Sequence, residues 1–557
     1  MKALTRPYNL LLIAGILIFS GCNQTQFPEI PQSTGLTILG LDGATWSVID
    51  FLIDKGELPG FKRLKEEGSW GFLETFTPTE SISLWTTIAT GVSPSRHGVH
   101  TFTRRIPGTD QYVPSPSTDR QVPALWNMVS DKGKTVVSVK WFATWPAEQV
   151  NGAMLSPRLE AEDTDPRTYP LDLFNEIDPF RYQSIMDDFP QPPLPKQNPQ
   201  MLLQQPIKAL NSERNAPPIL IGQSKVSSKM FDDTSVWLAG KYVYNKYSPD
   251  LFMLYLKSTD RVQHFLWGSH NENSVDPEKK AEAEAIYVWY RFYDDIILEL
   301  LEDQTRTLMV VSDHGFHSLE SVDDPYYIWD IDFDLILEFA GFLVRHGQKT
   351  AWPQTSAYTY RNMPYDKAVL FRLNMVGREP DGVVTQEAAS SQLGDLAATL
   401  KQIQTMEGIK LFDDIQIFDE EATLFCKLTD TISLDDVIFL DNRLLKLRNI
   451  IIQKGLPRGL HTHAPPGIFV AHGPGIERGK TITGAKLFDI TPTALRILGL
   501  PVAQDFDGHV IENIFSPGWK AIEYIPTYGS RQTIDELTVT DGDNRMLDEL
   551  RALGYIQ

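Results

Sequence analysis

Residues 36–43 read LTILGLDG, a largely apolar run that ends in Asp42 and Gly43. Such a run, closed by a turn residue, is typical of a strand buried on both faces of a sheet. Four further runs share this pattern: TVVSVKW at 135–141, LFMLYLKS at 251–258, TLMVVSD at 307–313 and GIFVAHG at 467–473. Helical patterns lie between them, for example at 278–302 and 490–498. This alternation predicts an α/β fold with a mostly parallel central sheet flanked by helices.

Two long stretches do not follow the strand and helix alternation. Residues 157–235 are rich in Pro, Gln and Asp, so we expect an irregular cap or loop excursion there. Residues 320–460 combine a predicted helix at 328–343, a second at 386–402 and an acidic stretch. We expect this part to be an inserted subdomain within a main domain at 35–515, and residues 516–557 to form a C-terminal tail.

The N-terminus carries the features of an export signal. Lys2 and Arg6 precede an apolar stretch of about ten residues, shorter than the roughly 20 needed to span a bilayer. Small residues precede Cys22, as in a bacterial lipobox, so we expect a signal peptide at 1–21 and lipidation of Cys22. A polar tether at 22–34 would follow. The prediction is an exported, membrane-anchored lipoprotein on the periplasmic or cell-surface side, with simple secretion as the alternative.

Charge and cysteine content narrow the partners. The 51 Lys and Arg against 72 Asp and Glu give a net charge of −21, which disfavours binding to a nucleic acid polymer. A small phosphorylated substrate remains compatible, because bound cations reverse the field locally. Cys426 is the only other cysteine, so lipidation of Cys22 would exclude an intrachain disulfide. No protein partner can be inferred.

Acidic residues follow three of the predicted strands. Asp42, Asp260 and Asp313 lie at or just past the ends of the runs that begin at 36, 251 and 307. In open parallel sheets, ligands bind at the carboxyl ends of the strands. An Asp-Gly pair after a strand is also a common turn, so Asp42 does not establish a site by itself.

Histidines accompany two of these aspartates. His314 follows Asp313, and adjacent side chains at a strand end point to different sides, so they can serve two cations, or one cation and one substrate. His264 lies four residues after Asp260, which places both on one face of a helix, a common way to supply two ligands to one metal. The alternative for this second pair is a helix N-terminal Asp with an exposed His.

Two residue types can complete a metal site. His461 and His463 lie in a loop before the run at 467–473, and either one can be a further ligand. Ser81 precedes a predicted helix at 83–91, so its hydroxyl would lie where backbone amides favour anions. A serine bound to a divalent cation loses its proton readily and can act as a nucleophile. An N-cap is the simpler role for Ser81, and geometry permits both.

Electrostatics favours grouping these residues around cations. Three carboxylates within several ångströms of one another repel, and they stay ionised only when cations are present. Mixed Asp and His ligands without cysteine suit zinc, and also manganese or iron, better than calcium or magnesium.

The motifs together resemble the alkaline phosphatase superfamily, and specifically its type I phosphodiesterase/nucleotide pyrophosphatase branch, over most of residues 35–511. The shared set comprises Asp42 after the first strand, Ser81 ten residues before Gly91 of TGVSPSRHG, the DRVQH pair at 260–264, the SDHG pair at 312–315 and a late histidine. Residues 487–510 and the LRALGYI segment near the C-terminus are also similar to segments found in that family.

The resemblance implies an alkaline-phosphatase-like sandwich that binds two divalent metal ions, usually zinc. The implied ligands are Asp260, His264 and His463 for one ion, and Asp42, Ser81, Asp313 and His314 for the other. It also implies that Ser81 attacks phosphorus in line, and that water then hydrolyses a phosphoserine-type intermediate.

The expected function is therefore an exported two-metal hydrolase of phosphoric esters, with diesters favoured over monoesters. Alternatives in the superfamily are a phosphomonoesterase and a transferase of a phospho-linked headgroup. A non-catalytic, ligand-binding surface lipoprotein is the alternative from another class. Nucleotide pyrophosphatases often carry Asn three residues after the nucleophile, where this chain has Leu84, so the natural substrate stays open.

Overall fold

The computed structural model describes residues 33–106, 108–159, 166–178, 219–221, 224–226, 233–267, 277–316, 327–347, 349–363, 367–419, 422–440, 442–455, 465–519 and 521–531. The predicted signal peptide, Cys22, most of the tether and residues 532–557 lie outside this part of the chain. Among the helices of the described residues, none combines the length and apolar character needed to cross a membrane.

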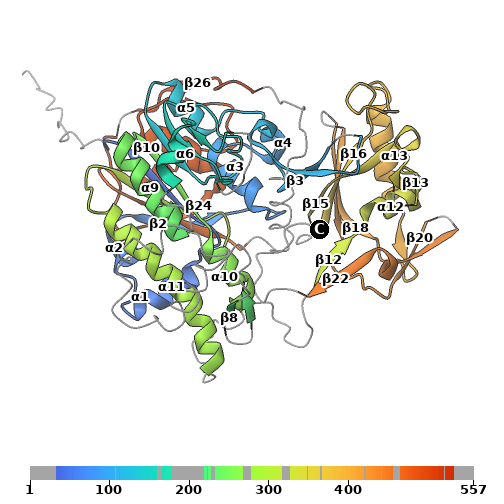
Figure 1. The fold of residues 1–557 in the computed structure, drawn as a ribbon, viewed down its shortest axis with the longest axis horizontal. Coiled ribbons are helices and arrows are strands. Elements are labelled where there is room, and N and C mark those ends of the chain that lie inside the picture. Colours follow the sequence, from blue (N-terminus) through green and yellow to red (C-terminus); the bar gives the residue numbers. More distant parts are fainter. Residues whose placement is uncertain are drawn as a thin grey trace, which may run out of the picture.

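A nine-stranded sheet forms the centre of the larger part of the molecule (Figure 1). Its strands, in spatial order, are β24 (Lys480–Lys486), β2 (Ser69–Glu74), β23 (Gly467–His472), β11 (Thr307–Val311), β1 (Leu36–Leu41), β10 (Leu251–Leu256), β5 (Val136–Val139), β6 (Gly152–Leu155) and β7 (Thr168–Tyr169). The five strands β11, β1, β10, β5 and β6 are parallel to one another. Strand β23 is antiparallel to both β11 and β2, and β7 is antiparallel to β6. This confirms the predicted α/β class with a mostly parallel sheet.

Helices cover both faces of this sheet because its central strands are apolar on both sides. All six residues of β1 are buried, with Leu39 and Leu41 facing one core and Leu36 and Ile38 facing the other. The helices on the first face are α1 (Trp46–Asp54), α2 (Pro59–Glu67), α9 (Asp233–Tyr247), α10 (Ser258–Leu266) and α11 (Pro277–Leu300). Those on the second face are α3 (Ser81–Thr90), α5 (Leu125–Asp131) and α14 (Ile490–Ile497).

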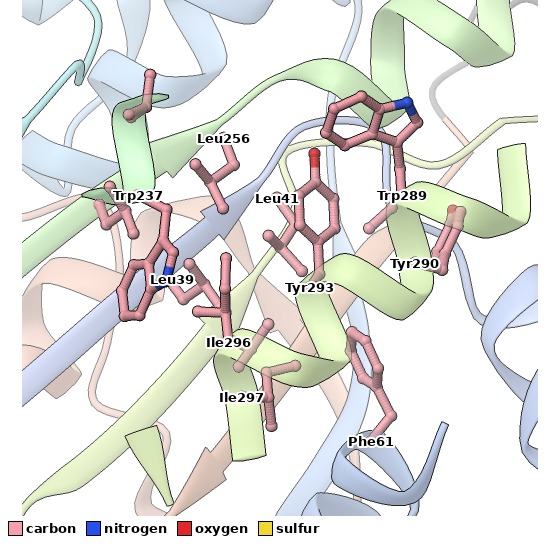
Figure 2. Close-up of a cluster of buried hydrophobic side chains, with 14 of the residues drawn as sticks. Leu39, Leu41, Phe61, Trp237, Leu256, Trp289, Tyr290, Tyr293, Ile296 and Ile297 are labelled. Atoms are coloured by element: carbon pink, nitrogen blue, oxygen red, sulfur yellow. The ribbon is translucent and has the colours of Figure 1, made fainter. Parts of the chain in front are cut away.

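The long helix α11 packs across the first face. Figure 2 shows side chains of this helix, among them Tyr293 and Ile297, directed toward Leu39 and Leu41 of β1 and Leu256 of β10. Their recurrence every three or four residues keeps them on one side of the helix, as the sequence pattern predicts.

A second, smaller part of the chain lies to one side of the sandwich, drawn in yellow to orange in Figure 1. Its core is formed by α12 (Phe333–Ala340), α13 (Ala389–Leu400) and an antiparallel sheet. That sheet has the order β15 (Ala357–Met363), β16 (Ala368–Leu373), β19 (Thr423–Leu428) and β18 (Phe412–Phe418). Beside it lie β17 (Gln404–Thr405), β20 (Val437–Leu440) and β21 (Arg443–Lys446).

The helix predicted at 328–343 is wrong in its first part. Residues Tyr327–Ile331 form strand β12, which pairs antiparallel with β22 (Ile451–Gly455). Helix α12 begins only at Phe333, where the Asp332 side chain accepts a hydrogen bond from the Leu335 amide. The strand partner lies more than a hundred residues later, so the local pattern does not reveal it.

The described residues also contain short elements. These are α4 (Pro94–His97), α6 (Leu173–Ile177), β3 (Thr103–Arg105), β4 (Tyr112–Pro114), β8 (Ile219–Ile221), β9 (Ser224–Val226), β13 (Arg345–His346), β14 (Lys349–Thr350), β25 (Val502–Ala503) and β26 (Tyr524–Ile525).

Buried ion pairs connect the smaller part to the sandwich. Arg361 on β15 lies 3.6 Å from Asp119, which also pairs with Arg104 of β3 at 3.0 Å. Arg105, also on β3, lies 2.8 Å from Asp334 of α12. Removing one member of a buried pair leaves an uncompensated charge, so these contacts favour one relative position of the two parts.

Asp294 of α11 connects that helix to α2. Its carboxylate accepts hydrogen bonds from the amides of Gly60 and Phe61, at 2.9 and 2.7 Å. Burial nevertheless raises the pKa of Asp294 to about 7, because desolvation outweighs the two hydrogen bonds.

We predict that Asp294 makes the protein less stable as the pH rises from about 4 to about 7. In that window the folded chain holds a proton that the unfolded chain, with an Asp pKa of about 3.9, has lost. Asp294→Asn should therefore flatten the fall in the free energy of unfolding between pH 5 and pH 8, measured by denaturant titration. Glu302→Gln, at an exposed site just beyond the same helix, is the control. Equal pH slopes for Asp294→Asn and the wild type would contradict the assignment.

Candidate metal centre

Three neighbouring strands bring acidic residues to one edge of the sheet. Strand β1 lies between β10 and β11, and Leu41 pairs with Leu256 while Gly40 pairs with Val311, so the carboxyl ends of the three strands are level. Asp42 follows β1 directly and Asp313 comes two residues after β11, while Asp260 lies in the first turn of α10 after β10. All three side chains are buried.

His314 lies at the centre of this group. Its Nε2 is 3.4 Å from Asp42 Oδ1, 3.5 Å from Asp313 Oδ2 and 3.8 Å from Asp260 Oδ1. On the other side of the ring, Nδ1 is 3.1 Å from the carbonyl oxygen of Gly315. A carbonyl only accepts, so Nδ1 carries the proton and donates, and the lone pair of a neutral ring is on Nε2. This is the tautomer that a metal ligand needs.

Asp313 and His314 converge, whereas the sequence suggests that their side chains point to different sides. One ligand atom from each of Asp42, Asp313 and His314 can be chosen so that all three lie within 4.8 Å of one another. The chain turns sharply after β11, so the strand geometry on which the prediction rests no longer applies at residue 313.

The chemistry of this group fits a divalent cation. Asp42 Oδ1 and Asp313 Oδ2 are buried oxygens with no hydrogen-bond partner among the described residues. Burial, followed by the charges of Asp313 and Asp260, raises the pKa of Asp42 well above its ordinary value. Burial also raises the pKa of Asp313, to about 6. A bound cation would satisfy the orphan oxygens and keep both carboxylates ionised.

The Asp260 and His264 pair has the predicted helical geometry. Both lie on α10, and His264 Nε2 is 3.3 Å from Asp260 Oδ1. Asp233 holds the start of this helix, since its carboxylate accepts hydrogen bonds from the amides of Lys257 and Ser258 at 3.1 and 2.8 Å. His264 is buried, which excludes the alternative of an exposed histidine.

Phe316 packs against both histidines. Its ring centroid is 5.0 Å from that of His264 and 5.7 Å from that of His314. Gly43 makes room for this ring, because a Cβ at position 43 would lie 2.5 Å from Phe316 Cε2. Gly43 also has φ +66°, in the left-handed region that favours glycine.

Ser81 approaches the acidic residues from the second face of the sheet, where α3 packs, whereas α10 lies on the first face. It is the first residue of α3, it is buried, and its Oγ lies 3.4 Å from His314 Nε2. Glu80 occupies the N-cap position, so Ser81 is not the cap that the sequence also permits.

The TGVSPSRHG segment supports helix α3 through His97, whose role the sequence did not reveal. The amide of Val99 donates to His97 Nδ1 at 3.1 Å, so the proton of the neutral ring is on Nε2, which donates to Thr87 Oγ1 at 3.0 Å. His97 is fully buried, and burial lowers its pKa well below the ordinary value. The sequence signal for this contact was the histidine and glycine pair that ends the TGVSPSRHG segment, shortly after the helix.

Tyr255 is a second residue that the sequence did not single out. It lies on β10, and its hydroxyl donates a hydrogen bond to Asp42 Oδ2. Burial and the charge of Asp42 raise the pKa of Tyr255 well above its ordinary value, so the hydroxyl keeps its proton. A tyrosine inside an otherwise apolar buried strand was the available clue.

His461 and His463, the candidates for a late ligand, lie outside the described residues.

The comparisons with known proteins cover most of the chain. The profile of the family described as type I phosphodiesterase / nucleotide pyrophosphatase matches residues 36–411. A solved structure of phosphonoacetate hydrolase from Sinorhizobium meliloti 1021 in complex with phosphonoacetate aligns with a TM-score of 0.47 and 16% identity, over 84% of this chain and 97% of that chain. Murine ectonucleotide pyrophosphatase/phosphodiesterase 5, an inactive variant in complex with AMP, aligns with a TM-score of 0.45 and 12% identity, over 87% and 100% of the two chains. Among curated protein sequences, none matches significantly.

We predict that Gly43→Ala destabilises the protein more than Gly56→Ala does. Gly56 has a similar φ of +75°, but among the described residues no atom beyond its own chain neighbours lies within 4 Å of the position that its Cβ would take. Alanine there should therefore cost only the conformational strain of about 1 kcal/mol. At Gly43 the same strain is joined by displacement of Phe316 against His264 and His314. Urea unfolding should show the difference, and binding of an added divalent cation should weaken only in Gly43→Ala. An equal loss in the free energy of unfolding for both variants would show that the Phe316 ring does not restrict position 43.

Proposed function

The chain belongs to the type I phosphodiesterase/nucleotide pyrophosphatase family, whose members hydrolyse phosphoester bonds with divalent metal ions, and we propose that it uses Ser81 as the nucleophile of a two-metal phosphodiesterase. The observation that carries this proposal is the convergence of Asp42, Asp313 and His314 on one buried point, with the Ser81 hydroxyl 3.4 Å from His314. The orphan oxygens of Asp42 and Asp313 support it further.

We assign the ligands to two cations. One would be held by Asp42, Ser81, Asp313 and His314, and the other by Asp260, His264 and His463. Zinc suits this Asp and His set best, with manganese or iron as alternatives. When bound, such cations supply Lewis-acid stabilisation of the phosphoryl oxygens and lower the pKa of a coordinated hydroxyl.

The protein's own residues have separate tasks in the proposed reaction. Ser81 gives its proton to solvent water, and its Oγ forms a bond to phosphorus while the bond from phosphorus to the leaving-group oxygen breaks; that oxygen takes up a proton from solvent. The start of the ten-residue helix α3 favours the negative charge of the phosphoryl group, because its first amides lack intrahelical acceptors. Water then hydrolyses the phosphoserine, which restores the serine hydroxyl and releases the phosphorylated product.

The proposed substrate is a small phosphoric diester. A phosphomonoesterase and a headgroup transferase of the same superfamily share this metal chemistry and are the alternatives. A panel of synthetic phosphate diesters and monoesters, assayed with added zinc or manganese, distinguishes them. Faster turnover of diesters is expected. Monoester preference would favour the second function, whereas turnover only with an added alcohol acceptor would favour the transferase.

We also propose that the protein is exported and anchored through a lipidated Cys22. The supporting observation is the charged, then apolar, then small-residue order that ends at this cysteine. Mass spectrometry of the mature N-terminal peptide tests the proposal, since a free N-terminus upstream of Cys22 would contradict it.

Ser81→Ala should retain fold and metal while losing turnover by at least about a thousand-fold, because only the attacking hydroxyl is removed. Ser83→Ala is the matched control, since Ser83 is buried on the same helix but has no proposed role in the reaction. Initial rates on a diester, with metal content measured on the same samples, check the prediction. Normal turnover of Ser81→Ala would refute the nucleophile.

His463→Ala should lower the metal content by about one ion per chain, whereas His461→Ala should leave it unchanged. His463 is preferred because it lies four residues before Gly467, as in the family motif. Metal analysis after dialysis distinguishes the two variants. Loss of metal in His461→Ala alone would reverse the assignment.

A further inference from the structure

Tyr255 connects two neighbouring strands at the candidate metal centre. It pairs in register with Gly40 of β1, and its hydroxyl extends past the end of that strand to donate a hydrogen bond to Asp42 Oδ2. Gly40 leaves this face of β1 open, where a Cβ would lie 2.7 Å from the Trp85 ring.

The ring of Tyr255 is held on several sides. Its centroid lies 5.1 Å from that of Trp85, 4.8 Å from that of Phe142 and 6.5 Å from that of Trp141. Trp141 is itself held by a hydrogen bond of 3.1 Å from its indole nitrogen to the carbonyl oxygen of Trp85. Tyr255 is only 4% exposed as a residue, so the hydroxyl has little freedom to leave Asp42.

This contact separates the two oxygens of Asp42. Oδ2 accepts the tyrosine hydrogen bond, whereas Oδ1 faces His314 Nε2 at 3.4 Å and has no hydrogen-bond partner among the described residues. A carboxylate arranged in this way presents one oxygen to a cation. Because the hydrogen bond occupies one lone pair of Oδ2 and fixes the carboxylate plane, removal of the hydroxyl would free Oδ2 to act as a second ligand.

We infer that Tyr255 is a positioning residue that holds Asp42 in one-oxygen coordination, and that the centre thereby selects a small four-coordinate cation over larger six-coordinate ones. The inference rests on the proposed function, because it concerns the cation that Asp42 would hold. Zinc favours four ligands in a tetrahedron, whereas manganese favours six, largely from oxygen. A second oxygen from Asp42 would add a ligand and favour the larger ion.

The test is Tyr255→Phe, which removes the hydroxyl and keeps the packed ring. Tyr358→Phe is the matched control, because Tyr358 is also buried and its hydroxyl donates to a buried carboxylate, Glu379 Oε1 at 3.0 Å, in the core of the smaller part. Zinc and manganese affinities are measured by chelator competition. The visible absorption of the cobalt-substituted proteins reports coordination number, since four-coordinate cobalt(II) absorbs much more strongly than six-coordinate cobalt(II).

Tyr255→Phe should bind zinc about 10- to 100-fold more weakly, the range typical for loss of an outer-shell hydrogen bond to a metal ligand. Its manganese affinity should fall less, so the ratio of zinc affinity to manganese affinity should decrease. The visible absorption of the cobalt-substituted variant should be weaker than that of the wild type. Tyr358→Phe should match the wild type in all three measurements.

Three results overturn the inference. Unchanged affinities in Tyr255→Phe would show that the hydroxyl has no influence on the metal. An equal loss for zinc and manganese, with the cobalt spectrum intact, would show a general structural role without selectivity. A folded wild type that binds neither ion would refute the proposed metal ligands themselves, so failure of the proposed function is distinguishable from failure of the Tyr255 assignment.

Discussion

The mutual repulsion of three buried carboxylates is the constraint on which the rest of the structure depends. Asp42, Asp260 and Asp313 meet at one edge because β10, β1 and β11 are parallel neighbours whose carboxyl ends are level. Two such charges about 4 Å apart repel by about 4 kcal/mol at an effective dielectric of about 20. A fold that only needed stability would gain from replacing these carboxylates. Bound divalent cations would offset this repulsion, as expected for a member of a metal-dependent hydrolase family.

The residues around the centre hold the charged groups in one arrangement. Gln263 donates from Nε2 to the carbonyl oxygen of Gly43 at 2.8 Å and accepts from Tyr290 of α11 at 2.8 Å, which ties the turn after β1 to the sandwich core. Phe316 fills the space between the two histidines, and Asp233 holds the start of α10. These contacts come from the first face of the sheet, whereas Tyr255 supports Asp42 from the second. Outer hydrogen bonds of this kind are known to tune metal ligands.

The sequence predicts the parts of the fold that local patterns encode. The apolar runs at 36–41 and 251–256 form the central strands β1 and β10, and the spacing of Asp260 and His264 indicates the face of α10 on which both lie. The local pattern wrongly predicts helix for strand β12, because its partner β22 is distant in the chain and pairing of this kind has no local signature. The contacts of Tyr255 and His97 escape prediction for the same reason: burial can be read from a sequence, but the identity of the neighbour across a strand or a turn cannot.

The metal content of the purified protein tests the central claim most directly. Inductively coupled plasma mass spectrometry, combined with diester hydrolysis before chelation, after chelation and after return of zinc, measures occupancy and dependence on the same sample. The account predicts two divalent ions per chain, loss of turnover on their removal and recovery on their return. A folded, metal-free protein that hydrolyses diesters at an undiminished rate would contradict it.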